Sequence, residues 1–153
     1  MRKLFLTFFY SGLAPKAPGT FGTLAGAAAA WFILMYFPLD TLFLATILIT
    51  IIGVREINNY ENDGGEHDDK SIVIDEVAGI WLALILSGAT IWQFAFSIIY
   101  FRIFDIWKPS IIGRIDKNMK GGMGVMGDDL IAGIVAGICS AATFGLLQKF
   151  GLA

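Results

Sequence analysis

The sequence predicts an all-α, polytopic membrane protein with about five membrane helices and a short interfacial helix before them. Of its 153 residues, 56% are hydrophobic and only 16% are charged, whereas a soluble domain has about half apolar and a quarter charged residues. The mean hydropathy is +0.70. The apolar residues also fall into several long runs. We expect a single domain that covers residues 1–153.

The N-terminus has some features of a secretory signal peptide, because a basic segment, residues 1–3, precedes an apolar stretch. That stretch is short and aromatic, and Pro15 and Pro18 disfavour cleavage after it. We therefore predict that Leu4–Leu13 forms a short interfacial or re-entrant helix at headgroup depth, with the basic residues in the cytoplasm.

The predicted membrane helices follow in order along the chain. A bilayer core of about 30 Å needs about 20 helical residues, and fewer where protein covers part of a helix. The segments that fit are Thr20–Phe37, Thr41–Asn59, Asp75–Leu86, Ile91–Trp107 and Asp128–Lys149. The third is short for a full crossing, so we expect its first turn to begin below the headgroups. A Gly- and Lys-rich loop, Lys108–Gly127, precedes the last helix.

The charged residues divide between the two sides of the predicted membrane. Alternate crossings place the polar loops on one side and the turns at Asp40 and Ser87 on the other. Of thirteen acidic and eleven basic residues, only Asp40 and Lys149 fall on the second side. An excess of basic residues is typical of the cytoplasmic face, so we expect the loop-rich side to be cytoplasmic.

The composition excludes two other classes of protein. The net charge is −2 and the basic residues form no dense cluster, so a nucleic-acid partner is not expected. Cys139 is the single cysteine and lies in an apolar run, which excludes a disulfide framework and a thiolate metal cluster. A homo-oligomer is compatible with the sequence, but nothing in the sequence indicates one.

Ionisable residues gather where the predicted helices meet the cytoplasmic side. An ionisable group at membrane depth is costly and therefore suggests a function. The groups are His67, Asp68 and Asp69 in a polar loop, Asp75 and Glu76 on the third helix, Arg102, Asp105 and Lys108 on the fourth, and Asp128 and Asp129 on the fifth. We expect these helix ends to direct several carboxylates to one place, where a cation offsets their repulsion.

Each group also has a structural explanation. Acidic residues in a first helical turn cap free N–H groups and complement the helix dipole, which accounts for one residue of each acidic pair. Arg102 and Asp105 are three residues apart and fit an intrahelical ion pair, and His67 alone fits a surface residue. None of these explanations predicts that the groups converge.

The types of residue favour a particular metal and chemistry. Carboxylates without cysteine, and with at most one histidine, favour Mg²⁺, with Mn²⁺ as its substitute, over Zn²⁺. Mg²⁺ beside Lys and Arg is typical of phosphoryl chemistry. Glycines such as Gly121 and Gly122 can present N–H groups to an anion, and the segment around Thr20 either holds a headgroup or turns the chain.

The last predicted helix carries a pair of small residues, Gly133 and Gly137, that allows another helix to approach closely. Asp129 lies four residues before Gly133, and therefore on the same face of the helix. We expect this face to pack against a neighbour.

The chain carries several motifs in a fixed order: Gly12–Thr20, His67-Asp68, Ser71–Glu76, Phe101–Pro109 and Gly121–Asp129. They resemble those of the phosphatidylglycerophosphatase A family of bacterial inner-membrane lipid phosphatases, over about Ser11 to Gly137. The resemblance implies Mg²⁺-dependent hydrolysis of phosphatidylglycerol phosphate to phosphatidylglycerol and phosphate, in glycerophospholipid biosynthesis. It also implies a multi-pass protein of the bacterial inner membrane that takes its substrate from the lipid bilayer.

With this resemblance, candidate roles follow for the clustered residues. The expected catalytic carboxylates, which would share one or two Mg²⁺, are Asp75, Glu76, Asp105, Asp128 and Asp129. His67 or Asp68 is the candidate proton shuttle. The candidate substrate-binding residues are Lys108, Arg102, Thr20, Gly121 and Gly122. Direct attack by water and a route through an aspartyl phosphate are both open.

Two other functions fit parts of the pattern. An ion or proton transporter also places carboxylates in membrane helices, but the outer halves of these helices are apolar. A CDP-alcohol phosphotransferase also uses Mg²⁺ and membrane-facing aspartates, but the sequence lacks its spaced array of aspartates with Gly and Ala between them.

Overall fold

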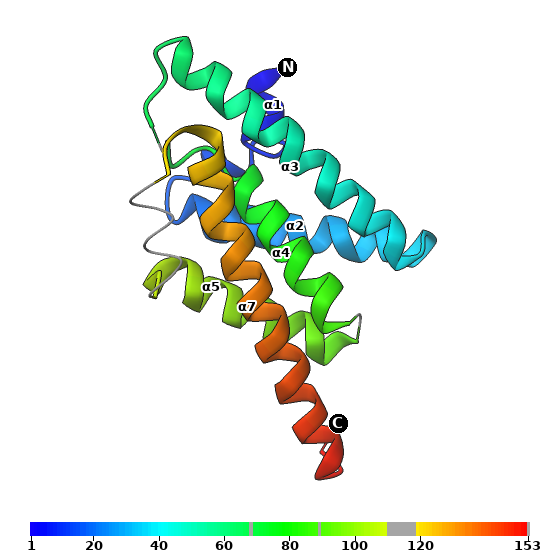
Figure 1. The fold of residues 1–153 in the computed structure, drawn as a ribbon. Helices are drawn as coiled ribbons and strands as arrows, with labels where there is room; N and C mark the ends of the chain where they lie inside the picture. The colour runs from blue at the N-terminus through cyan, green and yellow to red at the C-terminus, as the bar shows by residue number, and fades with distance from the viewer. Residues whose placement is uncertain (68, 89, 110–118, 153) are drawn as a thin grey trace.

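The computed structural model describes residues 1–67, 69–88, 90–109 and 119–152, and within these ranges all regular structure is helical. The elements are α1 (Arg2–Leu6), the 3-10 helix η1 (Ser11–Leu13), α2 (Pro18–Tyr36), α3 (Leu39–Asn62), α4 (Ile74–Ser87), α5 (Ile91–Trp107) and α7 (Gly121–Lys149). Figure 1 shows α2 and α3 joined at one end, with α2 crossing behind α4 and α7 running along α4. The predicted all-α class is confirmed.

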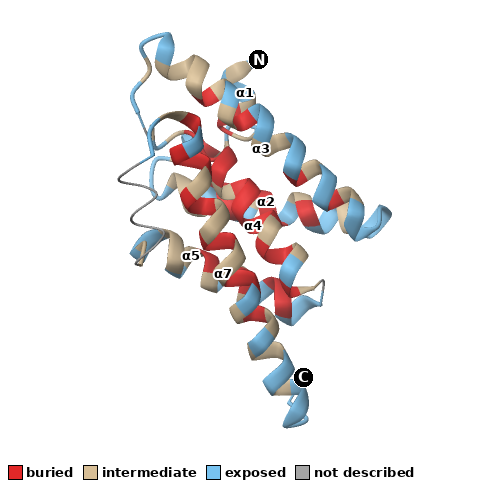
Figure 2. Cartoon of the chain, viewed as in Figure 1, coloured by how far each residue is buried: buried red, intermediate tan, exposed pale blue. Residues whose placement is uncertain are grey.

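The short helix α4 lies at the centre of the fold. It packs along α7 and also contacts α2, α3 and α5. Ten of its 14 residues are buried, and Figure 2 shows that buried residues concentrate on α4 and on the faces turned toward it. A helix of this length extends about 21 Å, less than a bilayer core. Because most of its residues are buried against other helices, α4 is enclosed by its neighbours on most sides.

Glycines allow the neighbouring helices to approach α4 closely. A Cβ atom on Gly133 of α7 would overlap the carbonyl oxygen of Gly79, and one on Gly137 would lie 2.7 Å from the carbonyl oxygen of Ala83. The predicted close packing of this face is therefore confirmed, and its partner is α4. On the other side of α4, the Trp81 indole N–H donates a 2.7 Å hydrogen bond to the carbonyl of Gly26 in α2.

Most helix bounds agree with those predicted. The bounds of α5 are the predicted ones, and those of α2, α3 and α4 differ by at most three residues. The start of α5 is fixed by a capping box, in which Thr90 accepts a hydrogen bond from the Gln93 N–H and the Gln93 side chain accepts one from the Thr90 N–H.

The prediction that the last helix opens at Asp128 is wrong. Helix α7 begins at Gly121, so the glycine-rich segment before Asp128 is helical. These glycines allow close packing on α3, since a Cβ atom on Gly122 would overlap the carbonyl of Val54. The Asn58 side chain also accepts a 2.8 Å hydrogen bond from the Gly122 N–H. Asp128 and Asp129 therefore lie too far along α7 to cap its free N–H groups.

The predicted interfacial helix Leu4–Leu13 is also wrong in extent. Helix α1 ends at Leu6, and the next residues form a turn in which Phe8, Phe9 and Tyr10 have φ of 39°, 54° and 67°. These left-handed conformations break the helix. The turn is held to the rest of the protein, because the Val73 N–H donates a 2.9 Å hydrogen bond to the Leu6 carbonyl.

The outer surface is compatible with a membrane. Within the described residues, α2 and α7 are long and apolar enough to cross a bilayer. The expectation of five crossings is not confirmed by this finding. Large apolar side chains are nevertheless exposed along α3 and α5, including Leu44, Ile51 and Ile103. These helices and this surface are those of a membrane-associated protein.

Candidate active site

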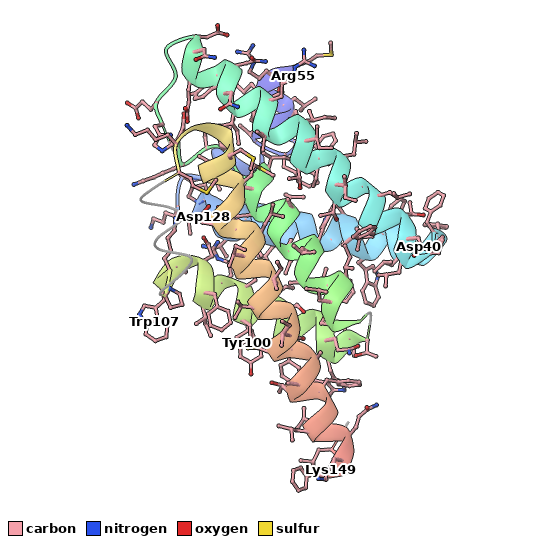
Figure 3. All side chains as sticks on the ribbon, in the orientation of Figure 1. Asp40, Arg55, Tyr100, Trp107, Asp128 and Lys149 are labelled. Carbon is pink, nitrogen blue, oxygen red and sulfur yellow. The ribbon has the colours of Figure 1, made fainter. Side chains whose placement is uncertain are left out.

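One cavity of about 440 Å³ collects charged side chains from several helices. Its charged and titratable lining residues are His67, Asp69, Lys70, Asp75, Glu76, Arg102, Asp105, Lys108, Asp128 and Asp129. The four groups singled out in the sequence therefore meet at one place. Figure 3 shows Asp128, one of these lining residues, far from Asp40 and Lys149.

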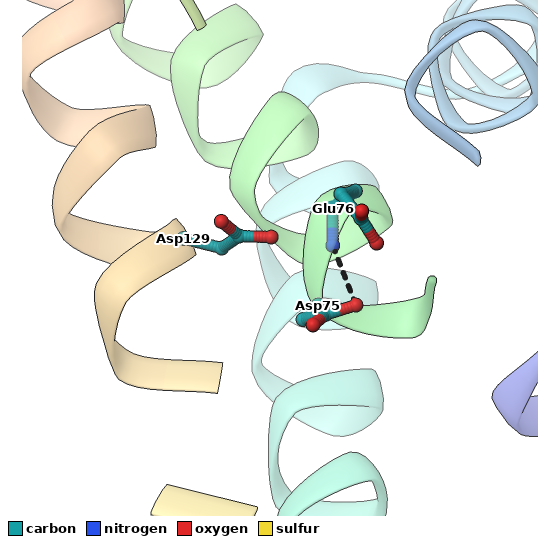
Figure 4. Close-up of side chains that lie close together, drawn as sticks. All are labelled: Asp75, Glu76 and Asp129. Atoms are coloured by element: carbon teal, nitrogen blue, oxygen red, sulfur yellow. Dashed lines mark hydrogen bonds between the residues drawn. The ribbon is translucent and has the colours of Figure 1, made fainter. Parts of the chain in front are cut away.

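Three carboxylates form the centre of the cavity wall. Asp75 and Glu76 of α4 and Asp129 of α7 each offer one oxygen atom, and these three atoms lie within 4.8 Å of one another. Figure 4 shows Asp129 reaching from α7 toward Asp75 and Glu76 on the first turn of α4. Asp75 is 7% exposed and Asp129 is 4% exposed. Carboxylates this close and this buried repel one another strongly unless a cation lies between them.

The first turn of α4 aims two of these carboxylates. Asp75 accepts a 3.0 Å hydrogen bond from the Glu76 N–H, so Asp75 also satisfies one free N–H group of the helix. Helix capping therefore explains the acidic residue at position 75 but not the one at position 76. Glu76 Oε2 is buried and has no hydrogen-bond partner among the described residues. Because buried carboxylate oxygens are normally satisfied, this atom fits a cation ligand, and the donor set fits Mg²⁺.

Among the cationic side chains that line the cavity, Lys108 and Arg102 each contact a carboxylate. Lys108 Nζ lies 2.7 Å from Asp128 Oδ2. Arg102 forms an ion pair with Asp105 on the same helix, and its Nη1 lies 3.5 Å from the Thr23 hydroxyl. The predicted intrahelical pair is therefore present, and it also faces the cavity. These contacts offset part of the negative charge of the cavity, whose lining contains more acidic than basic residues.

The loop between α3 and α4 brings a histidine to the cavity. His67 Nδ1 lies 2.6 Å from Glu61 Oε1. The Tyr60 hydroxyl donates a 2.5 Å hydrogen bond to Asp69, which also accepts one from the Ser71 N–H. These hydrogen bonds, that of Tyr60 above all, lower the pKa of the Asp69 carboxyl. Asp68, the other predicted proton shuttle, lies outside the described residues.

Three of the predicted substrate-binding residues are not among those that line the cavity. Thr20 is in the first turn of α2, where the lining residues are Pro18 and Gly19 instead. Gly121 and Gly122 lie at the N-terminus of α7, beside Asn58. Their role in substrate binding stays a prediction, and their packing explains why they are glycines.

Sequence reasoning assigned no role to several residues of this region. Gly19 and Lys70 line the cavity, and Glu61 contacts His67. Gly19 belongs to the motif Gly12–Thr20, but the motif did not predict that Gly19 lies against Glu76. Lys70 and Glu61 lie in a polar stretch where neither carries a distinguishing pattern.

Comparison with known proteins identifies the family. Residues 4–144 match the family model described as Phosphatidylglycerophosphatase A. The chain belongs to the phosphatidylglycerophosphatase A family. The match includes every charged residue of the cavity, and it confirms the resemblance noted in the sequence. No solved structure gives a significant match.

Three curated relatives span most of this phosphatidylglycerophosphatase A family member. Phosphatidylglycerophosphatase A of Escherichia coli is 42% identical over 129 residues, which are 84% of this chain and 74% of the relative. The protein of that name from Haemophilus influenzae is 37% identical over 84% of this chain and 79% of its own. A Bacteroides thetaiotaomicron protein named "Putative phosphatidylinositol-3-phosphatase" is 38% identical over 88% of both chains.

Proposed function

We propose that this chain is a Mg²⁺-dependent lipid phosphatase that hydrolyses phosphatidylglycerol phosphate to phosphatidylglycerol and inorganic phosphate. The observation that carries the proposal is the buried cluster of Asp75, Glu76 and Asp129, which shares a cavity with Arg102 and Lys108. Family membership and the two relatives named Phosphatidylglycerophosphatase A support this choice of substrate.

The carboxylate cluster would hold the metal ion. Asp75, Glu76 and Asp129 supply oxygen ligands of the kind that Mg²⁺ prefers and that Mn²⁺ also accepts. Asp105 and Asp128 line the same cavity and are further candidate ligands. Bound Mg²⁺ would act as a Lewis acid and neutralise charge on the phosphate.

Arg102 and Lys108 would bind the non-bridging oxygens of the phosphate. The planar guanidinium of Arg102 can donate two hydrogen bonds to one phosphate, and the ammonium of Lys108 acts as a point charge. Their contacts with Asp105 and Asp128 hold both groups at the cavity wall. A phosphate there would be oriented with its leaving oxygen turned toward the lipid.

His67 would transfer the proton to the leaving group. When the imidazole is protonated, its Nδ1–H donates to Glu61 and its Nε2–H is available to an acceptor in the cavity. In direct hydrolysis, a water oxygen would bond to phosphorus as the bond between phosphorus and the glycerol oxygen breaks. The glycerol oxygen would take the proton from Nε2, and the proton lost by the water would return the imidazole to its protonated form. Asp68 is the second candidate for this role.

We place the site on the cytoplasmic side of a bacterial inner membrane that the chain crosses several times. The two long apolar helices, α2 and α7, support an integral position. So do the apolar residues exposed on α3 and α5. The substrate would then enter sideways from the inner leaflet, with its phosphate in the cavity and its acyl chains in lipid.

Phosphate release from defined lipids tests this proposal. The purified chain would be mixed with vesicles that contain phosphatidylglycerol phosphate, with Mg²⁺ or with excess chelator. Vesicles with phosphatidylinositol 3-phosphate form a second arm, because one relative carries that activity in its name. We expect Mg²⁺-dependent release, fastest from phosphatidylglycerol phosphate. Absence of phosphate release from phosphatidylglycerol phosphate would contradict the proposal. A requirement for a nucleotide would contradict it as well. Ion flux in liposomes would indicate a transporter instead.

A further inference from the structure

We propose that Gly19 is a positioning residue for the Glu76 carboxylate. Its lack of a side chain allows the first turn of α2 to lie against Glu76, and this contact determines where the carboxylate sits in the cluster with Asp75 and Asp129. The inference rests on the proposed function in one respect: that the cluster of Asp75, Glu76 and Asp129 binds a cation.

The geometry around Gly19 leaves no space for a side chain. A Cβ atom on Gly19 would overlap Glu76 Oε1 and would lie 3.2 Å from Arg102 Nη1. Atoms in protein interiors are close-packed, so such an overlap must be relieved by movement. Because Oε1 is at the end of a flexible side chain, the carboxylate would move rather than the helix.

Backbone conformation does not explain the glycine. Gly19 is not among the glycines with positive φ, so another residue can adopt its conformation. Glycine is also a poorer helix former than alanine. The close approach of Glu76 and Arg102 is therefore the structural reason for a glycine here.

Two other glycines on α2 provide a contrast. A Cβ atom on Gly22 would lie 2.5 Å from the Cβ atom of Val73, and one on Gly26 would lie 3.0 Å from Ile80 Cγ2. The Val73 atom is attached directly to the backbone, so relief at Gly22 requires the helices to separate. Gly19 therefore faces a movable carboxylate, whereas Gly22 faces a rigid apolar contact.

This contrast predicts opposite effects for the same substitution at two positions. Gly19→Ala should displace the Glu76 carboxylate with little loss of stability. Gly22→Ala should instead lower stability, because Val73 cannot move away without its backbone. Mn²⁺ serves as the probe, and its binding to the purified full chain is followed by the electron paramagnetic resonance signal of the free ion.

We expect Gly19→Ala to weaken Mn²⁺ binding about tenfold or more, with Tm changed by less than about 3 °C. Gly137→Ala is the matched control. Its Cβ atom would meet Ala83 and Leu86, near the end of α4 that is far from the carboxylates, so it should lower Tm by more than this with near-parental Mn²⁺ affinity. In a Glu76→Asp background, the shorter carboxylate is withdrawn from position 19, so Gly19→Ala should then change the affinity by less than about threefold.

Parental Mn²⁺ affinity in Gly19→Ala would overturn the inference. So would an equal loss in the parent and Glu76→Asp backgrounds, or a parent chain that binds no Mn²⁺. Phosphate release is measured separately on the same samples. A parent that binds Mn²⁺ but releases no phosphate from the lipid would overturn the proposed function, and the test of Gly19 would still stand.

Discussion

Lys108 Nζ lies 2.7 Å from Asp128 Oδ2, and this ion pair joins the residue after α5 to α7. Lys108 follows the last residue of α5 in a left-handed conformation, with φ of 44°, and Asp128 lies inside α7. The pair therefore links the C-terminal end of α5 to the wall of the charged cavity. It also holds an ammonium group where a phosphate would arrive.

Lys108→Met tests this role, because methionine keeps an apolar stem and removes the charge. We expect kcat/KM to fall about 100-fold, or about 2.7 kcal/mol, with the Mg²⁺ dependence unchanged. Lys149→Met, at the opposite end of α7, is the control and should have near-parental activity. If Lys108 only extends toward anionic lipid, the loss will be small and will disappear at high salt.

Asp129→Asn removes a charge from the carboxylate cluster and keeps the shape of the side chain. We expect the rate to fall about 100-fold or more, and Asp75→Asn to behave in the same way. In excess chelator, both variants should have a higher Tm than the parent, because one of three mutually repelling charges is gone. Asp40→Asn, far from the cavity, should change neither quantity. If Asp75→Asn and Asp129→Asn fold well and release phosphate at near-parental rates, these residues have only structural roles.

Mg²⁺ should stabilise the protein as well as activate it. An ion that binds the folded state raises its stability with increasing ion concentration, so Tm should rise as Mg²⁺ is added to chelator-treated protein. Ca²⁺ at equal concentration controls for general ionic effects. The cluster would lose its assignment as a metal site if Tm were unchanged by Mg²⁺ while Asp129→Asn abolished activity.

Tyr60→Phe removes the hydroxyl that holds Asp69, and its effect should depend on pH. The pKa of Asp69 is lowered in the folded protein, chiefly by this hydroxyl. The stabilisation is therefore complete above the ordinary aspartate pKa of about 4 and is lost as pH falls through the lowered value. Thermal unfolding of both proteins from pH 7 to pH 3 should show a Tm difference that shrinks in acid. A constant difference would show that Asp69 ionisation is not involved.

The ends of two helices show what the sequence could and could not predict. The bounds of α5 were predictable because a short polar turn and a charged segment enclose its apolar run. The start of α7 was not, because glycine favours a loop when only neighbouring residues are considered. Contacts with Val54 and Asn58 of α3 decide that start, and the local sequence contains no sign of them.

The sequence was enough to predict which residues of the candidate site gather together, but not which of them contact one another. Assuming alternate membrane crossings, the sequence predicted Asp75, Asp105 and Asp128 on one side, and all three line one cavity. The pairing of Lys108 with Asp128 depends on the left-handed residue at 108 and on the early start of α7. The approach of Gly19 to Glu76 depends on how α2 crosses α4. Both are tertiary relationships, which residue spacing does not encode.

The hydrogen bond between Val73 and Leu6 has a practical consequence for handling the protein. It joins the N-terminal segment to the residue that directly precedes α4, and Arg2 is held to α3 by ion pairs with Glu56 and Asp63. A bulky affinity tag fused to the first residue would therefore pull on the helix that carries Asp75 and Glu76. The last turns of α7 extend beyond the other helices (Figure 1), so purification tags and fluorescent fusions belong at the C-terminus.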